Sequence, residues 1–559
     1  MRQHVTKIGA TGAMALSIAI LGGVVSSAQL QGPSTQQSSY VVPSRSVVRT
    51  SSVLSVGDQV GAKRMVGLPD GLGAFDNGDG TFTLLMNHEL GNAAGVARAH
   101  GSKGAFVSRW IIDKENLSVV SGADLMERVY LWDTANQRSA AVATTFAFNR
   151  FCSGDLPAIS AFYNAKTGRG TTERIYTHGE EGGSTGFQLG TVVTGPDAGS
   201  AYVLGKFNLN TNGSGINAVG AWENALASPY PQDKTIVIAN SDGGIGIMTN
   251  AVAVYIGTKQ TTGTDVDRAG LTNGTLRFVN VAGSTAEIVN TTTRATNIVS
   301  GARFTLNATT STAFSRPEDG AWNPLEPNEY YFVTTDQLDQ VSDGAGAQVG
   351  QTRLWRLTFD DITKPENGGK IDLLIDGRTV NGEKVNMFDN IAVNEKTGVV
   401  ILQEDVGNAA HNGKIWLYNP DTNVLTKVAN HDRVRFGDIG VAATAPFNQD
   451  EESSGVIDMS SILGAGMYLT SDQAHYVINA ANPRGFTNPD ELVEGGQLLA
   501  LRIPFPVVAD KDTCKNDGWE WVFRGDGGVF KNQGDCIQYV NTGKYPRASR
   551  DQLCARRHE

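Results

Sequence analysis

Residues 314–324 read FSRPEDGAWNP, and residues 329–337 read EYYFVTTDQ. The first segment begins a short strand near an acidic residue, Glu318, and ends in a turn rich in Pro and Asn. The second segment is an aromatic and β-branched strand that runs back to Asp336. Because the two strands form a hairpin, both carboxylates are expected to emerge at the same end of it. If this unit recurs around a closed ring, its carboxylates converge on one axis.

The same order of strand, turn and strand recurs along the chain. A second clear copy covers residues 389–405 and continues at 413–418, just as the first copy continues at 353–357 and 370–375. Looser copies begin at Asp70, Cys152, Glu223 and Glu452. Four antiparallel strands with a period of about 70 residues are typical of a propeller blade. We therefore predict an all-β fold, a six-bladed β-propeller with long inter-strand loops over residues 55–506.

The composition agrees with a β-rich protein that binds cations. The 559 residues include 65 Gly, and no long stretch keeps a helical apolar period. With 46 basic and 57 acidic residues the net charge is -11, which argues against a nucleic-acid backbone as partner. Closure of the ring would remove exposed sheet edges, and residues 496–503 are the predicted closing strand.

The two ends of the chain carry export features. Residues 1–28 have the basic start, apolar centre and small-residue end of a Sec-type signal peptide, and a retained N-terminal anchor is the alternative. Residues 29–54, rich in Ser and Gln, are predicted to be a flexible lead-in. No later apolar run reaches the roughly 20 residues of a membrane span. Residues 507–559 are predicted to form a small appendage outside the ring.

The four cysteines fall into two groups. Cys514 and Cys536 flank a short Gly-rich segment, and outside the cytosol a disulfide between them is favoured, with Cys554 as another available partner. Cys152 is a lone thiol beside Gly154 and Asp155. It is either a small buried apolar residue or a soft metal ligand.

The blades together bring many acidic and polar side chains to one rim. The predicted rim residues are Asp70, Asn87, Glu89, Cys152, Glu180, Glu223, Asp242, Glu318, Asp336, Asp389, Asp405, Glu452 and Asp472. Two like charges about 4 Å apart repel by roughly 4 kcal/mol at an effective dielectric of 20, so either the pKa values rise or cations bind. Any single one of these residues could instead be a solvated turn former. Their recurrence in register favours a metal site, in which the carboxylates suit Ca²⁺ and Cys152 would add a softer donor better suited to iron or zinc.

Eight short segments carry a resemblance when taken in their order and spacing. They are NHE at 87–89, CSG at 152–154, HGEEGG at 178–183, WEN at 222–224, RPE at 316–318, DNIAV at 389–393, ESSG at 452–455 and QAH at 473–475. Together they resemble the PhoX-type alkaline phosphatase family. The resemblance implies a six-bladed propeller with an iron and calcium cluster that hydrolyses phosphate monoesters.

The resemblance also implies roles for individual residues. Cys152 would be the iron-ligating thiolate, and Glu223 and Glu318 would be metal-bridging carboxylates. Asn87 and Arg316 would contact the phosphate, and no other predicted blade has an arginine that matches Arg316. Further candidates for binding Ca²⁺ or supporting the site are Glu89, Glu180, Asp389, Asp405 and Glu452. The implied cofactors are Ca²⁺ and Fe³⁺, and the implied substrate is a small phosphate ester.

The chain departs from the family pattern in its cysteine motifs and its signal. The first motif continues as Ser153-Gly154-Asp155, Gly179 precedes the glutamates where the family has Cys, and Arg2 is a single arginine where the family has a twin pair. The alternatives are a calcium-only site, a calcium-dependent lactonase-like hydrolase, and a non-catalytic calcium-binding propeller. In each case we expect a monomer that is secreted, periplasmic or attached to the cell surface.

Overall fold

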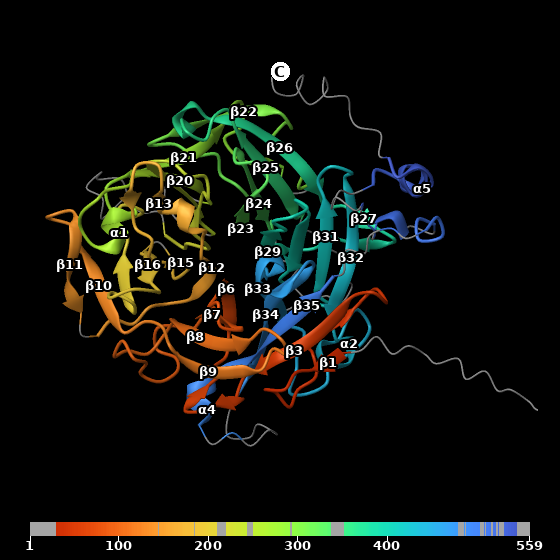
Figure 1. Ribbon diagram of the computed structural model, residues 1–559, viewed down its shortest axis with the longest axis horizontal. Helices are drawn as coiled ribbons and strands as arrows, with labels where there is room; N and C mark the ends of the chain where they lie inside the picture. Colours follow the sequence, from red (N-terminus) through yellow and green to blue (C-terminus); the bar gives the residue numbers. More distant parts are fainter. Residues whose placement is uncertain are drawn as a thin grey trace, which may run out of the picture.

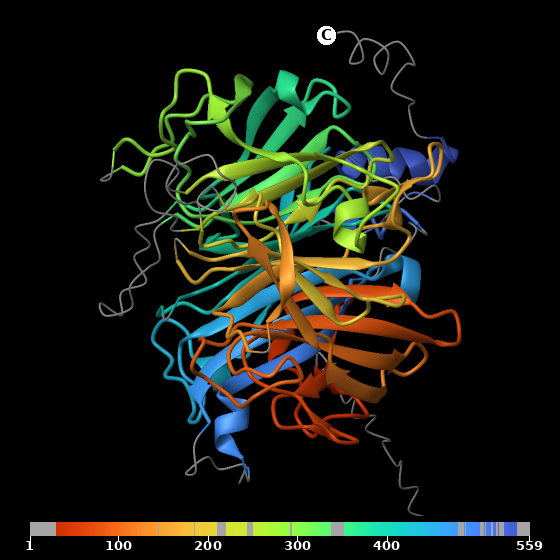
Figure 2. The same ribbon diagram turned by 90° about the vertical axis from the view of Figure 1, so that its left-hand side faces the viewer.

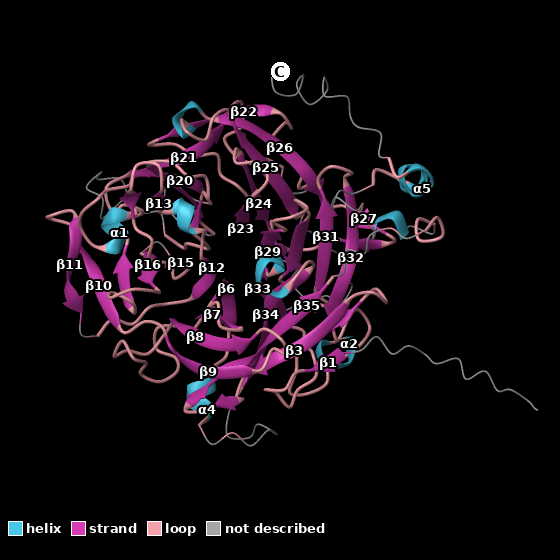
Figure 3. Cartoon of the chain, in the orientation of Figure 1, coloured by secondary structure: helices cyan, strands magenta, loops and turns pink. Residues whose placement is uncertain are grey.

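The computed structural model describes most of residues 29–544. The residues outside the description are 1–28, 144, 184, 209–219, 243–249, 291–292, 337–350, 408, 479–485, 487, 504–507, 509, 516–517, 521, 523, 525–529 and 545–559. The predicted signal peptide therefore lies outside the described residues. Strands form a ring around a central axis, and the few short helices lie in the connections between them (Figures 1 and 3). No described helix is long and apolar enough to cross a membrane.

Blades 1 and 2 begin the ring. Blade 1 contains β6 (Pro69–Asp76), β7 (Thr81–His88), β8 (Phe106–Asp113) and β9 (Val119–Asp124). Blade 2 contains β12 (Phe151–Asp155), β15 (Ile175–Glu180), β16 (Gln188–Val192) and β17 (Ser200–Val203). A hairpin that precedes blade 2 in sequence, β10 (Arg128–Asp133) and β11 (Arg138–Ala143), adds to its outer edge, with β10 parallel to β17.

Blades 3 and 4 join at their outer edges into one nine-stranded sheet. Blade 3 contains β18 (Leu226–Ala227), β19 (Lys234–Asn240), β20 (Val252–Thr258), β21 (Thr275–Val281) and β22 (Ala302–Asn307). Blade 4 contains β23 (Pro317–Trp322), β24 (Glu329–Thr334), β25 (Arg353–Phe359) and β26 (Gly369–Asp376). The antiparallel pair β22 and β26 connects the two blades.

Blades 5 and 6 complete the ring with help from the N-terminal segment. Blade 5 contains β29 (Phe388–Val393), β30 (Val400–Glu404), β31 (Lys414–Asn419), β32 (Val424–His431) and β2 (Val41–Pro43). Blade 6 contains β33 (Glu451–Asp458), β34 (Met467–Val477), β35 (Glu494–Arg502), β3 (Arg49–Ser55) and β1 (Gln29–Gln31).

Short hairpins and helices lie in the loops that connect the blade strands. Three small hairpin elements are β4 (Gln59–Val60) with β5 (Lys63–Arg64), β13 (Tyr163–Asn164) with β14 (Arg169–Gly170), and β27 (Thr379–Val380) with β28 (Glu383–Lys384). The short α-helices are α1 (Asp265–Arg268), α2 (Arg433–Phe436), α3 (Ser460–Leu463) and α4 (Pro489–Leu492).

The N-terminal strands close the ring, which differs from the sequence expectation. Residues 29–54 are predicted to be a flexible lead-in, but β3 pairs with β35 and lies beside it in Figure 1. The strand predicted to close the ring, 496–503, falls largely within β35, which pairs on its two sides with β34 and β3. The polar composition of residues 29–54 predicts a flexible segment, but the side chains of Val53 and Leu54 are buried in the core.

Six apolar clusters hold the blades together, one between each pair of neighbours. The cluster between blades 6 and 1, for example, joins Leu54 and Leu498 to Leu72 and Leu84. The other five occupy the remaining blade interfaces. Inner and middle strands are therefore buried on both faces, as in β24, where five of six residues are buried. This explains why such strands read as nearly continuous aromatic and β-branched runs.

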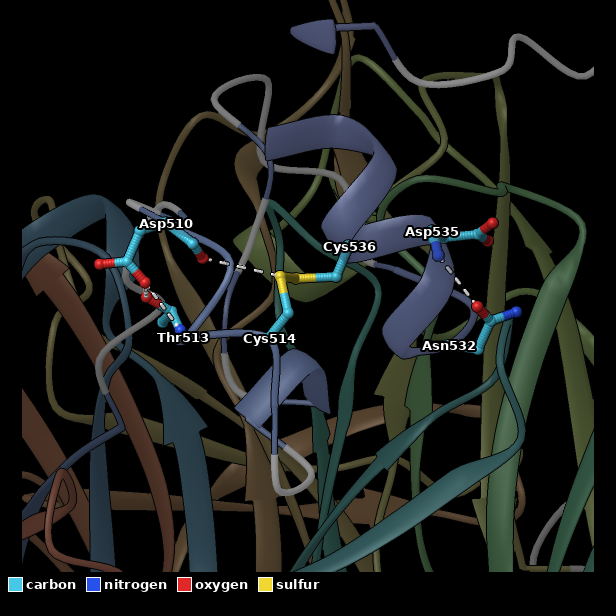
Figure 4. Close-up of a disulfide and its surroundings, with 6 residues drawn as sticks. All are labelled: Asp510, Thr513, Cys514, Asn532, Asp535 and Cys536. Atoms are coloured by element: carbon cyan, nitrogen blue, oxygen red, sulfur yellow. Dashed lines mark hydrogen bonds between the residues drawn. A yellow bond between two sulfur atoms is a disulfide. The ribbon is translucent and has the colours of Figure 1, made fainter. Parts of the chain in front are cut away.

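The C-terminal appendage is present and contains the predicted disulfide. Cys514 and Cys536 are bonded, and Asn532 caps the helix α5 (Gln533–Thr542) by accepting a hydrogen bond from the Asp535 backbone N–H (Figure 4). Phe530 and Val522 pack with the two cysteines in a small separate cluster. The helix lies outside the ring (Figures 1 and 2). Cys554, the alternative partner, is outside the described residues.

Shortening a side chain of the closing strand should destabilise the whole ring. Leu54 is fully buried, so Leu54→Ala should lower the free energy of unfolding by about 2–5 kcal/mol in urea denaturation. The control is Leu30→Ala in β1, where the side chain is 46% exposed and the change should stay within about 0.5 kcal/mol. Equal effects of the two substitutions would contradict closure through β3.

Candidate metal centre

Each inner strand contains the same irregularity near its start. The register with the second strand shifts by one residue between Pro69 and Leu72, Phe151 and Gly154, Pro317 and Gly320, Phe388 and Ile391, and Ser453 and Val456. In blade 3 the bridge from Trp222 to Ser241 and the pair of Leu226 with Ile238 show the same shift. A β-bulge re-aims side chains and bends the strand. All six blades therefore present equivalent residues at one level of the axis.

The first residue of each bulge forms what we call the axial ring. Its members are Asp70, Cys152, Glu223, Glu318, Asp389 and Ser454. The second residue of each bulge lies close to the neighbouring inner strand. At Gly71 a Cβ would come within 2.2 Å of the Gly154 backbone nitrogen, and at Gly455 within 2.7 Å of the Asp70 carbonyl oxygen. The absence of a side chain at these two positions lets the inner strands pack closely around the axis.

A second set of polar side chains lies where the second strand of each blade ends. We call it the rim ring, and its register-equivalent members are Glu89, Glu181, Asp242, Thr335, Asp405 and Gln473. Within this set Gln473 donates from Nε2 to Glu89 Oε2 at 2.8 Å and to the axial Asp70 Oδ2 at 3.2 Å. The rim ring and the axial ring are thus in direct contact.

Members of the two rings form three overlapping groups of metal-ligand atoms. The groups are Asp70 with Glu89 and Cys152, Cys152 with Glu181 and Glu223, and Glu223 with Glu318 and Asp389; within each, the donor atoms lie within 4.8 Å of one another. Cys152 belongs to the first two groups and Glu223 to the last two. Carboxylate oxygens suit Ca²⁺, while a thiolate adds a softer donor suited to iron or zinc.

Burial and mutual repulsion dominate the electrostatics of the axial ring. Burial raises the pKa of Asp70, Glu223, Glu318 and Asp389 well above the ordinary carboxyl value, and neighbouring carboxylates raise it further. Burial, followed by Glu181 and other nearby carboxylates, also raises the pKa of the Cys152 thiol. Without cations these groups therefore bind their protons more tightly than exposed ones do, and a bound metal would displace those protons.

An unpartnered buried oxygen fits the assignment of a metal site. The Oδ1 atom of Asp70 is buried and accepts no hydrogen bond from the described residues. An uncompensated buried acceptor of this kind costs about 1–3 kcal/mol. Its position in the first donor group leaves this oxygen available to a cation.

Two arginines supply part of the compensating charge. Arg150 Nη2 lies 2.7 Å from Glu89 Oε1 and also contacts Glu181. Arg316 Nη2 lies 2.8 Å from Asp242 Oδ2 and 2.9 Å from Glu318 Oε1. Arg316 has no predicted match in another blade, but the register places Arg150 at the equivalent position, one residue before the inner strand begins.

Asn87 has a structural contact that its predicted role does not include. Its Nδ2 donates to the Cys152 carbonyl oxygen at 2.6 Å and to that of Ser153 at 3.3 Å, while its Oδ1 is buried without a partner. In other blades Asn240 and Ser471 donate in the same way to the carbonyl oxygens of Glu318 and Asp70. The amide nitrogen that a phosphate would need is therefore already used, whereas the remaining Oδ1 is an acceptor.

Glu180 and Glu181 differ by one residue and occupy different environments. The Glu180 carboxylate accepts hydrogen bonds from the backbone N–H groups of Asn149 at 2.8 Å and Phe187 at 3.0 Å, and it belongs to none of the three donor groups. Glu181, which is not among the predicted site residues, belongs to the second group. An alignment of the second strands that matches Glu181 with Glu89, instead of choosing the first acidic residue Glu180, would have identified Glu181.

Asp405 and Glu452 flank the three groups without belonging to them. Asp405 and Glu452 form an isolated antiparallel bridge, and Asp405 Oδ1 accepts from the Gly407 N–H at 2.8 Å. Glu452 accepts from Ser454 Oγ and lies 3.8 Å from His475 Nε2, whose other ring nitrogen contacts Glu494 at 2.9 Å. These residues extend the acidic rim on the side of blades 5 and 6.

Two other predicted rim residues are engaged in ion pairs away from the donor groups. Asp336 pairs with Arg294 and accepts from Ser315 Oγ at 2.6 Å, which lowers its pKa despite burial. Asp472 lies 2.7 Å from His431 Nε2. Of the two carboxylates at the ends of the hairpin in residues 314–337, only Glu318 therefore reaches the candidate centre.

One comparison with a solved structure supports the fold. The structure is similar to that of Pseudomonas fluorescens PhoX in complex with vanadate, a transition state analogue, with a TM-score of 0.56, 10% identity, and coverage of 87% of this chain and 96% of that one. It is also matched to an α-L-arabinofuranosidase from Fusarium graminearum, with a TM-score of 0.37, 9% identity, and coverage of 78% and 93%. No protein-family model and no curated protein sequence matches the chain. The similarity to PhoX is one of fold.

The metal-free protein should lose stability as the pH rises from about 5 to 8. Burial raises the pKa of Glu181 and of Asp405 to about 7, so the folded state retains protons that the unfolded state releases above the ordinary carboxyl pKa. Added Ca²⁺ should reverse this loss, since it binds the deprotonated groups. The measurement is the Tm with chelator and with Ca²⁺ at both pH values, with Glu223→Gln as the variant that weakens the Ca²⁺ effect. A Tm that rises with pH in chelator would contradict the assignment.

Proposed function

We propose that this protein is an exported, metal-dependent hydrolase of phosphate monoesters whose site is the axial centre. The observation that carries the proposal is the set of three overlapping donor groups, with a buried arginine Nη1 beside them that has no partner among the described residues. That nitrogen belongs to Arg316, which contacts the third donor group through Glu318. Adjacent cations and a free guanidinium donor suit a phosphoryl group.

The donor sets support Ca²⁺ and Fe³⁺ as the cofactors. Iron would bind at Cys152 with Glu181 and Glu223, the group in which Cys152 Sγ lies 3.2 Å from Glu181 Oε2. Ca²⁺ would bind in the other two groups. One of them shares Cys152 with the iron group and adds Asp70 and Glu89, and the other shares Glu223 and adds Glu318 and Asp389. When bound, the metals would neutralise phosphoryl oxygens and activate an oxygen nucleophile.

The protein's own groups would orient the substrate and maintain the site. Arg316 is held by Asp242 through Nε and Nη2, so its planar fork is fixed before a ligand arrives. Asn87 would act as a positioning residue that holds the Cys152 backbone and offers Oδ1 towards cations. Glu180 would support the strand by accepting from two backbone N–H groups. Asp405 and Glu452 would add negative charge near the centre.

Export is supported by the disulfide in the appendage. Cys514 and Cys536 form a bond that persists in oxidising compartments and is rare in the cytosol. Together with the signal-like residues 1–28 this supports a secreted, periplasmic or surface-attached protein. It would then meet phosphate esters outside the cell.

Hydrolysis of p-nitrophenyl phosphate tests the proposed reaction. The purified protein supplied with Ca²⁺ and iron should release nitrophenol, and chelator should abolish turnover. Arg316→Ala should lower kcat by about 10²–10³-fold, as expected for loss of a transition-state donor, and Glu318→Gln by at least as much. The surface variant Arg303→Ala, which removes an exposed pair with Asp360, should retain activity. Absent turnover with both metals supplied would sink the proposal, and an accompanying Ca²⁺-dependent rise in Tm would favour a non-catalytic calcium-binding propeller.

Elemental analysis tests the metal assignment separately. Cys152→Ser should remove iron while leaving calcium largely in place, because the hard hydroxyl replaces the only thiol among the three donor groups. Wild-type protein that contains calcium but no iron after expression with both metals would support a calcium-only site instead.

A further inference from the structure

Arg150 is the structural counterpart of Arg316. Each arginine directly precedes an inner strand, and each has a left-handed backbone, with φ of 56° for Arg150 and 57° for Arg316. The equivalent residues of three other blades also have positive φ, but they are the apolar residues Leu68, Ala221 and Met387. The described ring therefore places an arginine at this position in blades 2 and 4 alone among these five blades.

The two arginines use the same atoms in the same way. Arg150 binds Glu89, the rim-ring carboxylate of the preceding blade, through Nε and Nη2, both at 2.7 Å. Arg316 binds Asp242, again the rim-ring carboxylate of the preceding blade, through Nε and Nη2. Arg316 Nη1 is buried and makes no hydrogen bond with the described residues, and the contacts of Arg150 with Glu89 and Glu181 use Nε and Nη2. Each guanidinium is thus fixed by one edge and presents the other.

The carboxylates around Arg150 hold its guanidinium in a fixed position near the donor groups, as expected for a hydrogen-bond donor of the site and not for a mobile surface charge. Glu89 belongs to the first donor group and Glu181, its second partner, belongs to the second. Arg316 contacts the third group through Glu318. The Arg150 side chain is 49% exposed, so a solute can reach it. A guanidinium held by two carboxylates remains charged and loses little conformational entropy when it binds an anion.

We propose that Arg150 is a second anion-contacting residue of the site, which together with Arg316 binds the terminal oxygens of a phosphate monoester dianion. This inference rests on the proposed function for the identity of the ligand. Two guanidinium donors favour a group with several terminal oxygens and two negative charges over a singly charged diester. Arg150 would therefore contribute to the choice of monoesters as well as to their affinity.

The simpler role for Arg150 is that of a counter-ion to Glu89 and Glu181. The experiment that separates the two roles is calorimetric titration of metal-loaded protein with orthophosphate, with bound metal and Tm measured for every sample. Arg150→Gln should weaken phosphate binding by about 10-fold or more, and Arg150→Lys should restore it only in part because it lacks the planar fork. Arg303→Ala should bind phosphate as the wild type does.

A charge-balanced double variant provides a further control, compared with the wild type at equal bound metal because Glu89 belongs to the first donor group. In Glu89→Gln with Arg150→Gln, the arginine and one of its two carboxylate partners are both neutral. Phosphate affinity should remain about 10-fold weaker than in wild type, and KM for p-nitrophenyl phosphate should rise more than kcat falls. Affinity restored to the wild-type value in the double variant, or unchanged in Arg150→Gln, would overturn the inference, as would wild-type protein that binds no orthophosphate. Phosphate bound through Arg150 without turnover would leave the inference standing while the proposed function fails.

Discussion

Electrostatic repulsion between buried carboxylates on one axis is the constraint on which the candidate centre depends. Asp70, Glu223, Glu318 and Asp389 come from four different blades, and each is at most 8% exposed. An ionised carboxylate so far from water is costly unless a positive charge or hydrogen-bond donors compensate it. The neighbouring groups supply only part of that compensation, since Arg316 contacts Glu318 and Gln473 donates to Asp70. Protons or metal cations must supply the rest.

The ring prevents these carboxylates from moving apart. An apolar cluster fills every blade interface, so an inner strand cannot retreat from the axis without opening two packed surfaces. Polar side chains add to this by holding the carbonyl oxygens of Asp70, Cys152 and Glu318 from the preceding blade. The packing of the whole ring therefore preorganises the centre. The closing strand β3 contributes to this packing through its pairing with β35, although β3 lies far from the site within blade 6.

Much of the architecture could be predicted because each blade repeats the same short-range pattern of strands and turns. Alternating runs with turns between them predicted six blades, and the spacing of Cys514 and Cys536 predicted the disulfide that the structure contains. The axial members Cys152, Glu223, Glu318 and Asp389 were also among the predicted site residues, and the structure brings them together. Glu181 and Arg150 were missed, because a one-residue shift in strand register changes which side chain faces the axis.

The sequence by itself therefore determined the repeating unit, the number of blades and the residue types available at the start of each inner strand. These follow from short-range periodicity, turn residues and composition, which a single chain displays directly. The tertiary structure alone decided which of those residues meet. The bulge in each inner strand selects Glu181 over Glu180, Arg294 engages Asp336, and the N-terminal strand β3 completes blade 6 from the opposite end of the chain. Such choices depend on strand register and on contacts between residues 42 to several hundred positions apart, which the short-range periodicity of one repeat does not display.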